Sequence, residues 1–135
     1  MKILVIEDQA TQLKLAHHVL SAAGHEVTDV EEPEKSFAAI KSNRPQLILL
    51  DLLLPDIDGL TLVRMLKNDP DTRDIPIVAV TSYPEAFPKS DALSAGCDAY
   101  FLKPINTREL SGQRDAVIEK RKIDTADVPE KIAAR

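Results

Sequence analysis

The sequence has no tryptophan, a single cysteine and no long run of apolar residues. One cysteine, Cys97, permits no internal disulfide and fits a reducing compartment, so we expect it to be a small core residue. No apolar run approaches the roughly 20 residues that a membrane-spanning helix needs. Residues 1–6 are too short for a signal peptide and lead directly into acidic residues. These absences predict a cytoplasmic protein that makes no membrane contact.

Basic residues are in the minority. The 135 residues include 17 Lys and Arg against 22 Asp and Glu, which gives a net charge of −5, and the pI is about 5.2. This balance argues against a nucleic-acid-binding surface. Hydrophobic residues make up 44% of the chain, which is ordinary for a globular protein and argues against disorder of the whole chain. The length suits one domain with a substantial core.

The sequence does contain short aliphatic runs that end on polar residues. Residues 47–50 are Leu-Ile-Leu-Leu, and an uninterrupted apolar run is typical of a central parallel strand covered on both faces. Residues 3–6, 77–80 and 99–102 predict three further strands. The more polar segment 26–30 predicts a strand at the edge of the sheet.

Segments with helical periodicity separate these runs. The expected helices are one ending near Gly24, one with Pro33 in its first turn, one with Asp58 as N-cap, one over about Glu85 to Ala95, and one capped by Asn106. Alternating strands and helices predict an α/β, doubly wound domain with a five-stranded parallel sheet and five helices on its two faces. We expect this domain to span 1–120 and the charged segment 121–135 to be a mobile tail.

Polar residues follow four of the strands and should meet at one edge. In a parallel sheet every strand's carboxyl end lies on the same edge, so Glu7-Asp8, Asp51, Thr81 and Lys103 should converge there. Neighbouring carboxylates repel unless a cation joins them, and Mg²⁺ prefers oxygen ligands. We predict Asp8 and Asp51 as direct ligands, Glu7 acting through water, and a backbone carbonyl just after Asp51 completing the set.

This convergence points to phosphoryl chemistry. A lone Asp at a strand end is more often a cap or turn residue than a nucleophile. Here an ammonium from Lys103, a hydroxyl from Thr81 and a magnesium ion would neutralise a phosphoryl group arriving on Asp51. The predicted product is an acyl phosphate on Asp51.

These residues resemble, in order, the pattern of response-regulator receiver domains of two-component signalling, the family of the chemotaxis response regulator. The resemblance covers about residues 2–120 and rests on a set of residues at strand ends: the pair Glu7-Asp8, Asp51 with Pro55 and Gly59, Thr81, Tyr100, and Lys103-Pro104. It implies the flavodoxin-like strand order 2-1-3-4-5 and a magnesium cofactor.

The resemblance also assigns roles. Glu7 and Asp8 would bind the metal, together with Asp51 and the backbone carbonyl of Leu53. Asp51 would be the phosphoacceptor. Thr81 would be the switch hydroxyl and Tyr100 the switch aromatic. Lys103 would be the phosphate-binding lysine, and its peptide bond to Pro104 would be cis.

The implied function is a switch, not a turnover enzyme. The phosphoryl group would come from a sensor histidine kinase or histidine phosphotransfer protein, and a downstream protein would bind the face of the fourth helix, fifth strand and fifth helix. We expect a long-lived phosphoryl group, because Leu53 stands where phosphatases that use an aspartyl phosphate carry an acid, and Tyr83 could crowd the attacking water. We expect Pro84 and Pro88 to affect the output face, as well as the polar pair Gln113-Arg114.

Two alternatives remain open: a phosphorylation-independent scaffold with the same fold, and a metal-dependent phosphatase. We expect no DNA-binding output domain, because only about 15 residues follow the last predicted helix. Homodimerisation is undetermined by the sequence.

Overall fold

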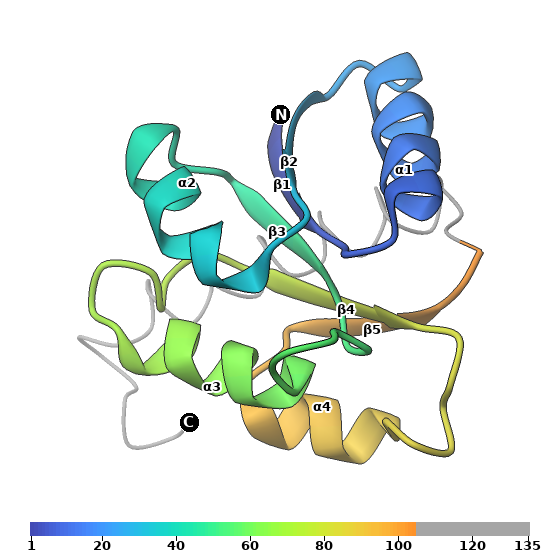
Figure 1. The fold of residues 1–135 in the computed structure, drawn as a ribbon. Coiled ribbons are helices and arrows are strands. Elements are labelled where there is room, and N and C mark those ends of the chain that lie inside the picture. Colours follow the sequence, from blue (N-terminus) through green and yellow to red (C-terminus); the bar gives the residue numbers. More distant parts are fainter. Residues whose placement is uncertain (105–135) are drawn as a thin grey trace, which may run out of the picture.

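A computed structural model describes residues 1–104 of the chain and shows a parallel sheet between helices (Figure 1). The elements, in chain order, are β1 (Lys2–Ile6), α1 (Ala10–Ala22), β2 (Glu26–Val30), the 3₁₀ turn η1 (Pro33–Lys35), α2 (Ser36–Ser42), β3 (Leu47–Asp51), α3 (Gly59–Asn68), β4 (Ile77–Thr81), α4 (Lys89–Ala95) and β5 (Ala99–Leu102). No helix in this part of the chain is long and apolar enough to cross a membrane.

The sheet has the order β2-β1-β3-β4-β5, and each described pairing is parallel. Both the predicted order and the edge position of segment 26–30 are therefore confirmed. All five residues of β3 and of β4 are buried, whereas β2 has only one buried residue. The uninterrupted aliphatic runs thus mark the strands that are covered on both faces.

The buried side chains form two cores, one on each face of the sheet. Side chains alternate between the faces of a strand, so Leu4 and Ile6 of β1 pack with buried residues of α2, α3 and α4. Ile3 and Val5 pack with α1, where Leu13 is among the buried residues. Figure 1 shows α1 on one side of the sheet and α2, α3 and α4 on the other. Each fully buried aliphatic side chain contributes about 1.5–3 kcal/mol to the free energy of folding, relative to an exposed one.

The start of α4 differs from its prediction. A helix was expected from about Glu85, but α4 begins at Lys89. The carbonyl of Tyr83 accepts a hydrogen bond from the Phe87 N–H at 3.0 Å, which closes a turn before the helix. Pro88 is the N-cap in an extended conformation, and a proline both lacks an N–H and disfavours a helical residue before it. The prolines therefore shorten α4 to its last two turns.

The start of α3 agrees with its prediction. The Asp58 side chain caps the helix by accepting a hydrogen bond from the Leu60 N–H at 2.8 Å. Gly59 follows directly, and a Cβ there would lie 2.5 Å from the backbone of Leu52. Glycine at this position lets the first turn of α3 pack against the chain that leaves β3.

Cys97 is buried, as predicted for a core residue. Burial first, and then the neighbouring carboxylate of Asp98, raises the pKa of its thiol to about 12. The predicted fifth helix from Asn106, with Gln113-Arg114, and the predicted tail 121–135 lie outside the described residues.

Candidate phosphoryl-acceptor site

The alternation of side chains along three strands brings the candidate site together. Val5 and Leu49 pack on the face of the sheet that α1 covers. Glu7 lies two residues after Val5, and Asp51 two residues after Leu49, so their side chains point to the same side of the sheet. Lys103 lies two residues after Phe101, which also packs on that face. The three charged side chains therefore emerge on the α1 side of the carboxyl edge.

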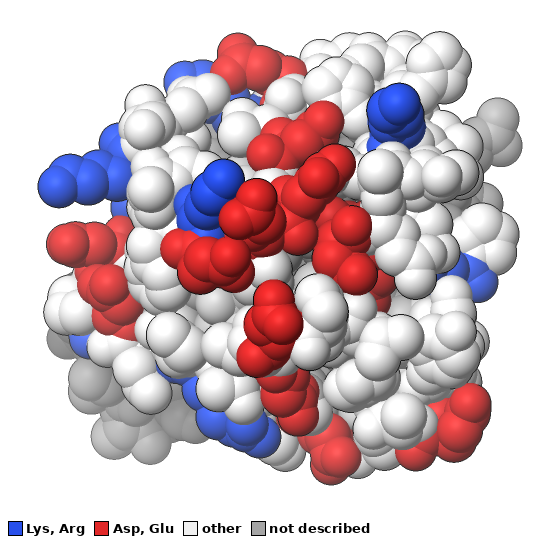
Figure 2. Space-filling view, viewed as in Figure 1, with Lys and Arg blue, Asp and Glu red and all other residues white. Residues whose placement is uncertain are grey.

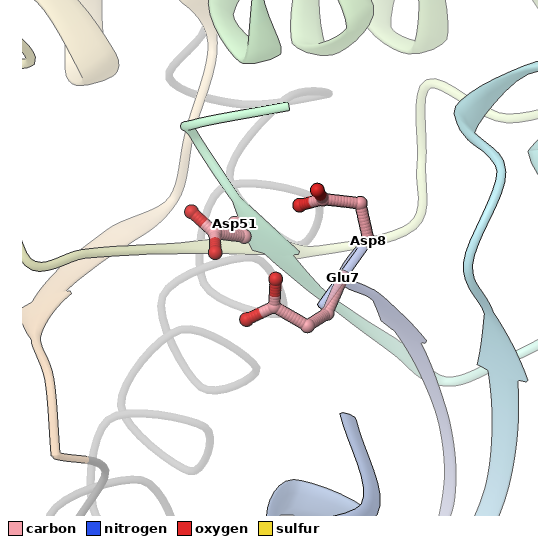
Figure 3. A group of neighbouring side chains, drawn as sticks. All are labelled: Glu7, Asp8 and Asp51. Atoms are coloured by element: carbon pink, nitrogen blue, oxygen red, sulfur yellow. The ribbon is translucent and has the colours of Figure 1, made fainter. Parts of the chain in front are cut away.

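Glu7, Asp8 and Asp51 point toward a common space (Figure 3). One carboxylate oxygen from each residue lies within 4.8 Å of the others. Glu7 is 4% exposed and Asp51 6%, whereas Asp8 is half-buried. Burial, and then the neighbouring Asp51, raise the pKa of Glu7 to about 7 despite the opposing effect of Lys103. A cluster of oxygen ligands that repel one another in this way fits a hard divalent cation such as Mg²⁺.

Lys103 crosses the sheet edge and joins two of these acids. Its Nζ lies 2.5 Å from Glu7 Oε1 and 2.7 Å from Asp51 Oδ2, and it also donates to Gln12 Oε1. Burial lowers the pKa of the Lys103 ammonium, but hydrogen bonds to Asp51 and Glu7 outweigh burial and leave it above the ordinary value. The lysine is therefore charged and positioned beside the predicted phosphoacceptor.

Backbone N–H groups orient the remaining carboxylate oxygens. The Leu53 N–H donates to Asp51 Oδ1 at 2.9 Å, and the Gln9 N–H donates to Glu7 Oε2 at 3.3 Å. The Leu53 side chain is 42% exposed beside the site. Both oxygens of Asp51 are thus held, Oδ1 by the backbone and Oδ2 by the lysine.

Thr81 lies next to the site but on the other parity of its strand. Its neighbour Val80 pairs with Asp51 in the sheet register. The Thr81 side chain is fully buried, and its Oγ1 accepts a hydrogen bond from the Tyr83 N–H at 2.9 Å. Its hydroxyl hydrogen remains available as a donor.

Tyr100 is half-buried against the core that contains α3 and α4. Its hydroxyl donates a 2.6 Å hydrogen bond to the backbone carbonyl of Phe87, at the end of the loop between β4 and α4. The predicted switch aromatic is therefore tied to the loop that begins at Thr81. The peptide bond between Lys103 and Pro104 is cis, as the resemblance implied.

Gln12 is the residue at this site that the sequence did not predict. It lies in the first turn of α1, and its side chain contacts both Lys103 and Gln9. The spacing of Gln9 and Gln12 places them on one side of a helical turn, and this spacing was the only signal in the sequence. It could not indicate the lysine, which is 91 residues away in the chain.

Acidic side chains gather over the middle of the face drawn in Figure 2, and most of the visible Lys and Arg lie toward its margins. A mainly acidic face repels anions at longer range, so the ammonium of Lys103 and any bound cation have to supply the local attraction for a phosphoryl group.

Comparisons with known proteins show what the whole chain is similar to. The family model described as "Response regulator receiver domain" matches residues 3–113. The phosphate regulon transcriptional regulatory protein PhoB of Pseudomonas aeruginosa is 35% identical over 127 residues, which are 94% of this chain and 56% of PhoB. The chain thus spans little more than half the length of that relative.

A shorter relative and a solved structure extend the likeness. The polar-differentiation response regulator DivK of Brucella anthropi is 32% identical over 104 residues, which are 77% of this chain and 85% of DivK. The structure of the chemotaxis response regulator CheY4 of Vibrio cholerae matches with a TM-score of 0.73 and 24% identity, over 86% of this chain and 97% of that one. At this identity the structural match establishes the fold.

Proposed function

The chain belongs to the response regulator receiver domain family, and from this premise we propose that it is a signalling switch phosphorylated on Asp51. Receiver domains are phosphoacceptors that interact with histidine kinases or phosphotransfer proteins, rather than turnover enzymes. The single observation that carries the assignment to Asp51 is the position of Lys103, whose Nζ contacts Asp51 Oδ2 and Glu7 Oε1 at once.

In the proposed reaction Asp51 is the nucleophile. Its Oδ2 attacks the phosphorus of the donor, the bond between phosphorus and the donor's imidazole nitrogen breaks, and that nitrogen leaves with the electron pair. The Leu53 N–H holds Oδ1 and so fixes the plane of the carboxylate. The Lys103 ammonium, 2.7 Å from Oδ2 before the reaction, meets the negative charge of the incoming phosphoryl oxygens.

Glu7, Asp8 and Asp51, with the backbone carbonyl of Leu53, would hold Mg²⁺. The bound ion supplies charge neutralisation for the phosphoryl oxygens and for the acids. The chain's own acids prepare this site by lying within 4.8 Å of one another with Glu7 largely removed from water. Burial, and then the neighbouring Asp51, raise the pKa of Glu7 to about 7, and a divalent cation among these acids would favour the ionised form of Glu7.

We propose that the signal leaves the site through Thr81 and Tyr100. A phosphoryl group on Asp51 would attract the Thr81 hydroxyl, and Thr81 is coupled to Tyr83 by the hydrogen bond from the Tyr83 N–H. The same loop ends at Phe87, whose carbonyl accepts from Tyr100. A shift of this loop would alter the surface of α4 and β5, and with it the affinity for a downstream protein.

We propose that the phosphoryl group is lost slowly. Leu53 offers no acid or base to activate water, and its half-exposed side chain lies beside Asp51. Leu53→Glu should therefore shorten the lifetime of the phosphoprotein by about tenfold or more, since a positioned general base contributes 10²–10⁴-fold in favourable cases. Met65 on α3 is an apolar residue with similar exposure, so Met65→Glu is the matched control and should leave the lifetime unchanged.

The test is to incubate the full chain with Mg²⁺ and acetyl phosphate and to measure the intact mass. We expect one added phosphoryl group, lost only over many minutes, and no addition to Asp51→Asn. Asp56→Asn changes an exposed acid on the next loop and should be labelled like the wild type. No label on the wild type would support a phosphorylation-independent scaffold instead, and rapid turnover of acetyl phosphate would support a phosphatase.

A further inference from the structure

The ammonium of Lys103 has three N–H donors and, within residues 1–104, three acceptors. Two acceptors are the carboxylates of Glu7 and Asp51, and the third is the amide oxygen of Gln12. The lysine side chain is 17% exposed, so water has limited access to replace a lost partner. Gln12 is therefore the neutral member of a complete set of ligands around the charge.

The amide of Gln12 is itself oriented. Its Nε2 donates a 2.7 Å hydrogen bond to Gln9 Oε1, which leaves Oε1 facing the lysine. Gln9 is the N-cap residue of α1, but its side chain makes no capping hydrogen bond to the helix. Its backbone N–H donates to Glu7 Oε2. The start of α1 thus links one acid of the site to the lysine, through the backbone N–H and side chain of Gln9 and then the side chain of Gln12.

The two carboxylates change their role when the site is used. Glu7 and Asp51 would each supply an oxygen to Mg²⁺, and Asp51 Oδ2 would carry the phosphoryl group. The amide of Gln12 is not needed by either, because a hard cation with three carboxylates nearby gains least from a neutral amide. Gln12 is consequently the one acceptor among the three that neither the metal nor the phosphoryl group would take from Lys103.

We propose that Gln12 is a positioning residue, which holds the Lys103 ammonium where it meets the phosphoryl group arriving on Asp51. The proposal rests on the function proposed above and adds to it a residue from α1. Gln9 acts one step further away, by orienting the Gln12 amide.

The sharpest variant is Gln12→Met, which keeps the length of the side chain and removes the acceptor. We expect the rate of Asp51 phosphorylation by acetyl phosphate at saturating Mg²⁺ to fall about five- to tenfold, as for the loss of one hydrogen bond to a charged group. Gln9→Ala should give a smaller decrease. Thr11→Ala, an exposed change in the same turn, is the control and should have no effect.

A double-mutant cycle separates positioning from a general effect on the fold. In the Lys103→Ala background, Gln12→Met should change the rate less than twofold, because Gln12 acts through the lysine. An equal decrease in both backgrounds, or no decrease in either, overturns the proposal.

A second measurement does not depend on phosphorylation. The side-chain ammonium signal of Lys103 in ¹H–¹⁵N NMR spectra should exchange its hydrogens several-fold faster with water in Gln12→Met than in the wild type. If the exchange rate is the same in the variant and the wild type, Gln12 does not position the lysine and the proposal is overturned, even if the wild type is phosphorylated normally. If the Lys103 hydrogens exchange faster in Gln12→Met than in the wild type but the wild type takes no phosphoryl group, the contact between Gln12 and Lys103 is supported. The proposed function, and with it the role of Gln12 in phosphoryl transfer, is then refuted.

Discussion

Replacing Glu7 by glutamine should stabilise the protein in the absence of Mg²⁺. Glu7 is 4% exposed and lies beside Asp51, and burial followed by that neighbour raises its pKa from 4.5 to about 7. Because each pKa unit corresponds to about 1.4 kcal/mol, keeping Glu7 ionised costs the folded state about 3 kcal/mol at high pH. Glutamine removes that cost but weakens the bond from Lys103, so we expect a net gain of about 1–2 kcal/mol at pH 8.

The pH dependence follows from the direction of the pKa shift. Below about pH 4.5 Glu7 is protonated in both the folded and the unfolded state and costs nothing. Between pH 4.5 and 7 the folded state binds more protons than the unfolded state, so this group makes stability fall as the pH rises. Above pH 7 the full cost is present. The advantage of Glu7→Gln should therefore be small at pH 5 and largest at pH 8.

The assay is urea unfolding followed by far-UV circular dichroism, since the chain has no tryptophan. Measurements at pH 5 and pH 8, each with EDTA and with Mg²⁺, give four free energies of unfolding for each variant. Mg²⁺ should stabilise the wild type more than Glu7→Gln and so reduce the difference at pH 8. Glu31→Gln, at an exposed acid, is the control. A variant that is less stable than the wild type at pH 8 in EDTA would refute the reasoning.

Three further predictions concern the metal and the framework. The affinity for Mg²⁺, measured by titration calorimetry, should rise between pH 6 and pH 8 because protons compete for Glu7, whose pKa is about 7; a flat profile would contradict this. Asp98→Ala should lower the free energy of unfolding by about 2–4 kcal/mol, since Asp98 Oδ2 accepts from both Lys67 Nζ and the Ile77 N–H; urea unfolding checks this value. Gly59→Ala should cost about 2 kcal/mol or more, because its Cβ would overlap backbone; an unchanged melting temperature would show that the loop before α3 relaxes freely.

Local sequence signals were sufficient for much of the fold. The runs at 3–6, 47–50 and 77–80 lack polar residues because β1, β3 and β4 are covered on both faces, and this property is visible without any structure. Asp58 capped its helix as predicted, because an N-cap needs only its own next two residues. The bounds of α4 were predicted less well: the helix begins at Lys89 and not near Glu85, because Pro88 is extended and disfavours a helical residue before it.

The candidate site divides in the same way. That Glu7, Asp8, Asp51 and Lys103 meet at one edge could be predicted, because all strands of a parallel sheet end there. Their metal-binding and phosphoryl-transfer roles remain proposals. What the sequence could not indicate was Gln12, whose partner lies 91 residues away.

The sequence by itself determined the strands, their parallel arrangement and the edge where the charged residues gather, because each depends on composition and order along the chain. Only the tertiary structure decided which face of the sheet each charged side chain joins. An aliphatic run with no alternation does not distinguish its two faces, so the division came from the crossovers that set α1 on one side and α2, α3 and α4 on the other. That division places Lys103 beside the first turn of α1, within reach of an amide that no local pattern connects to it.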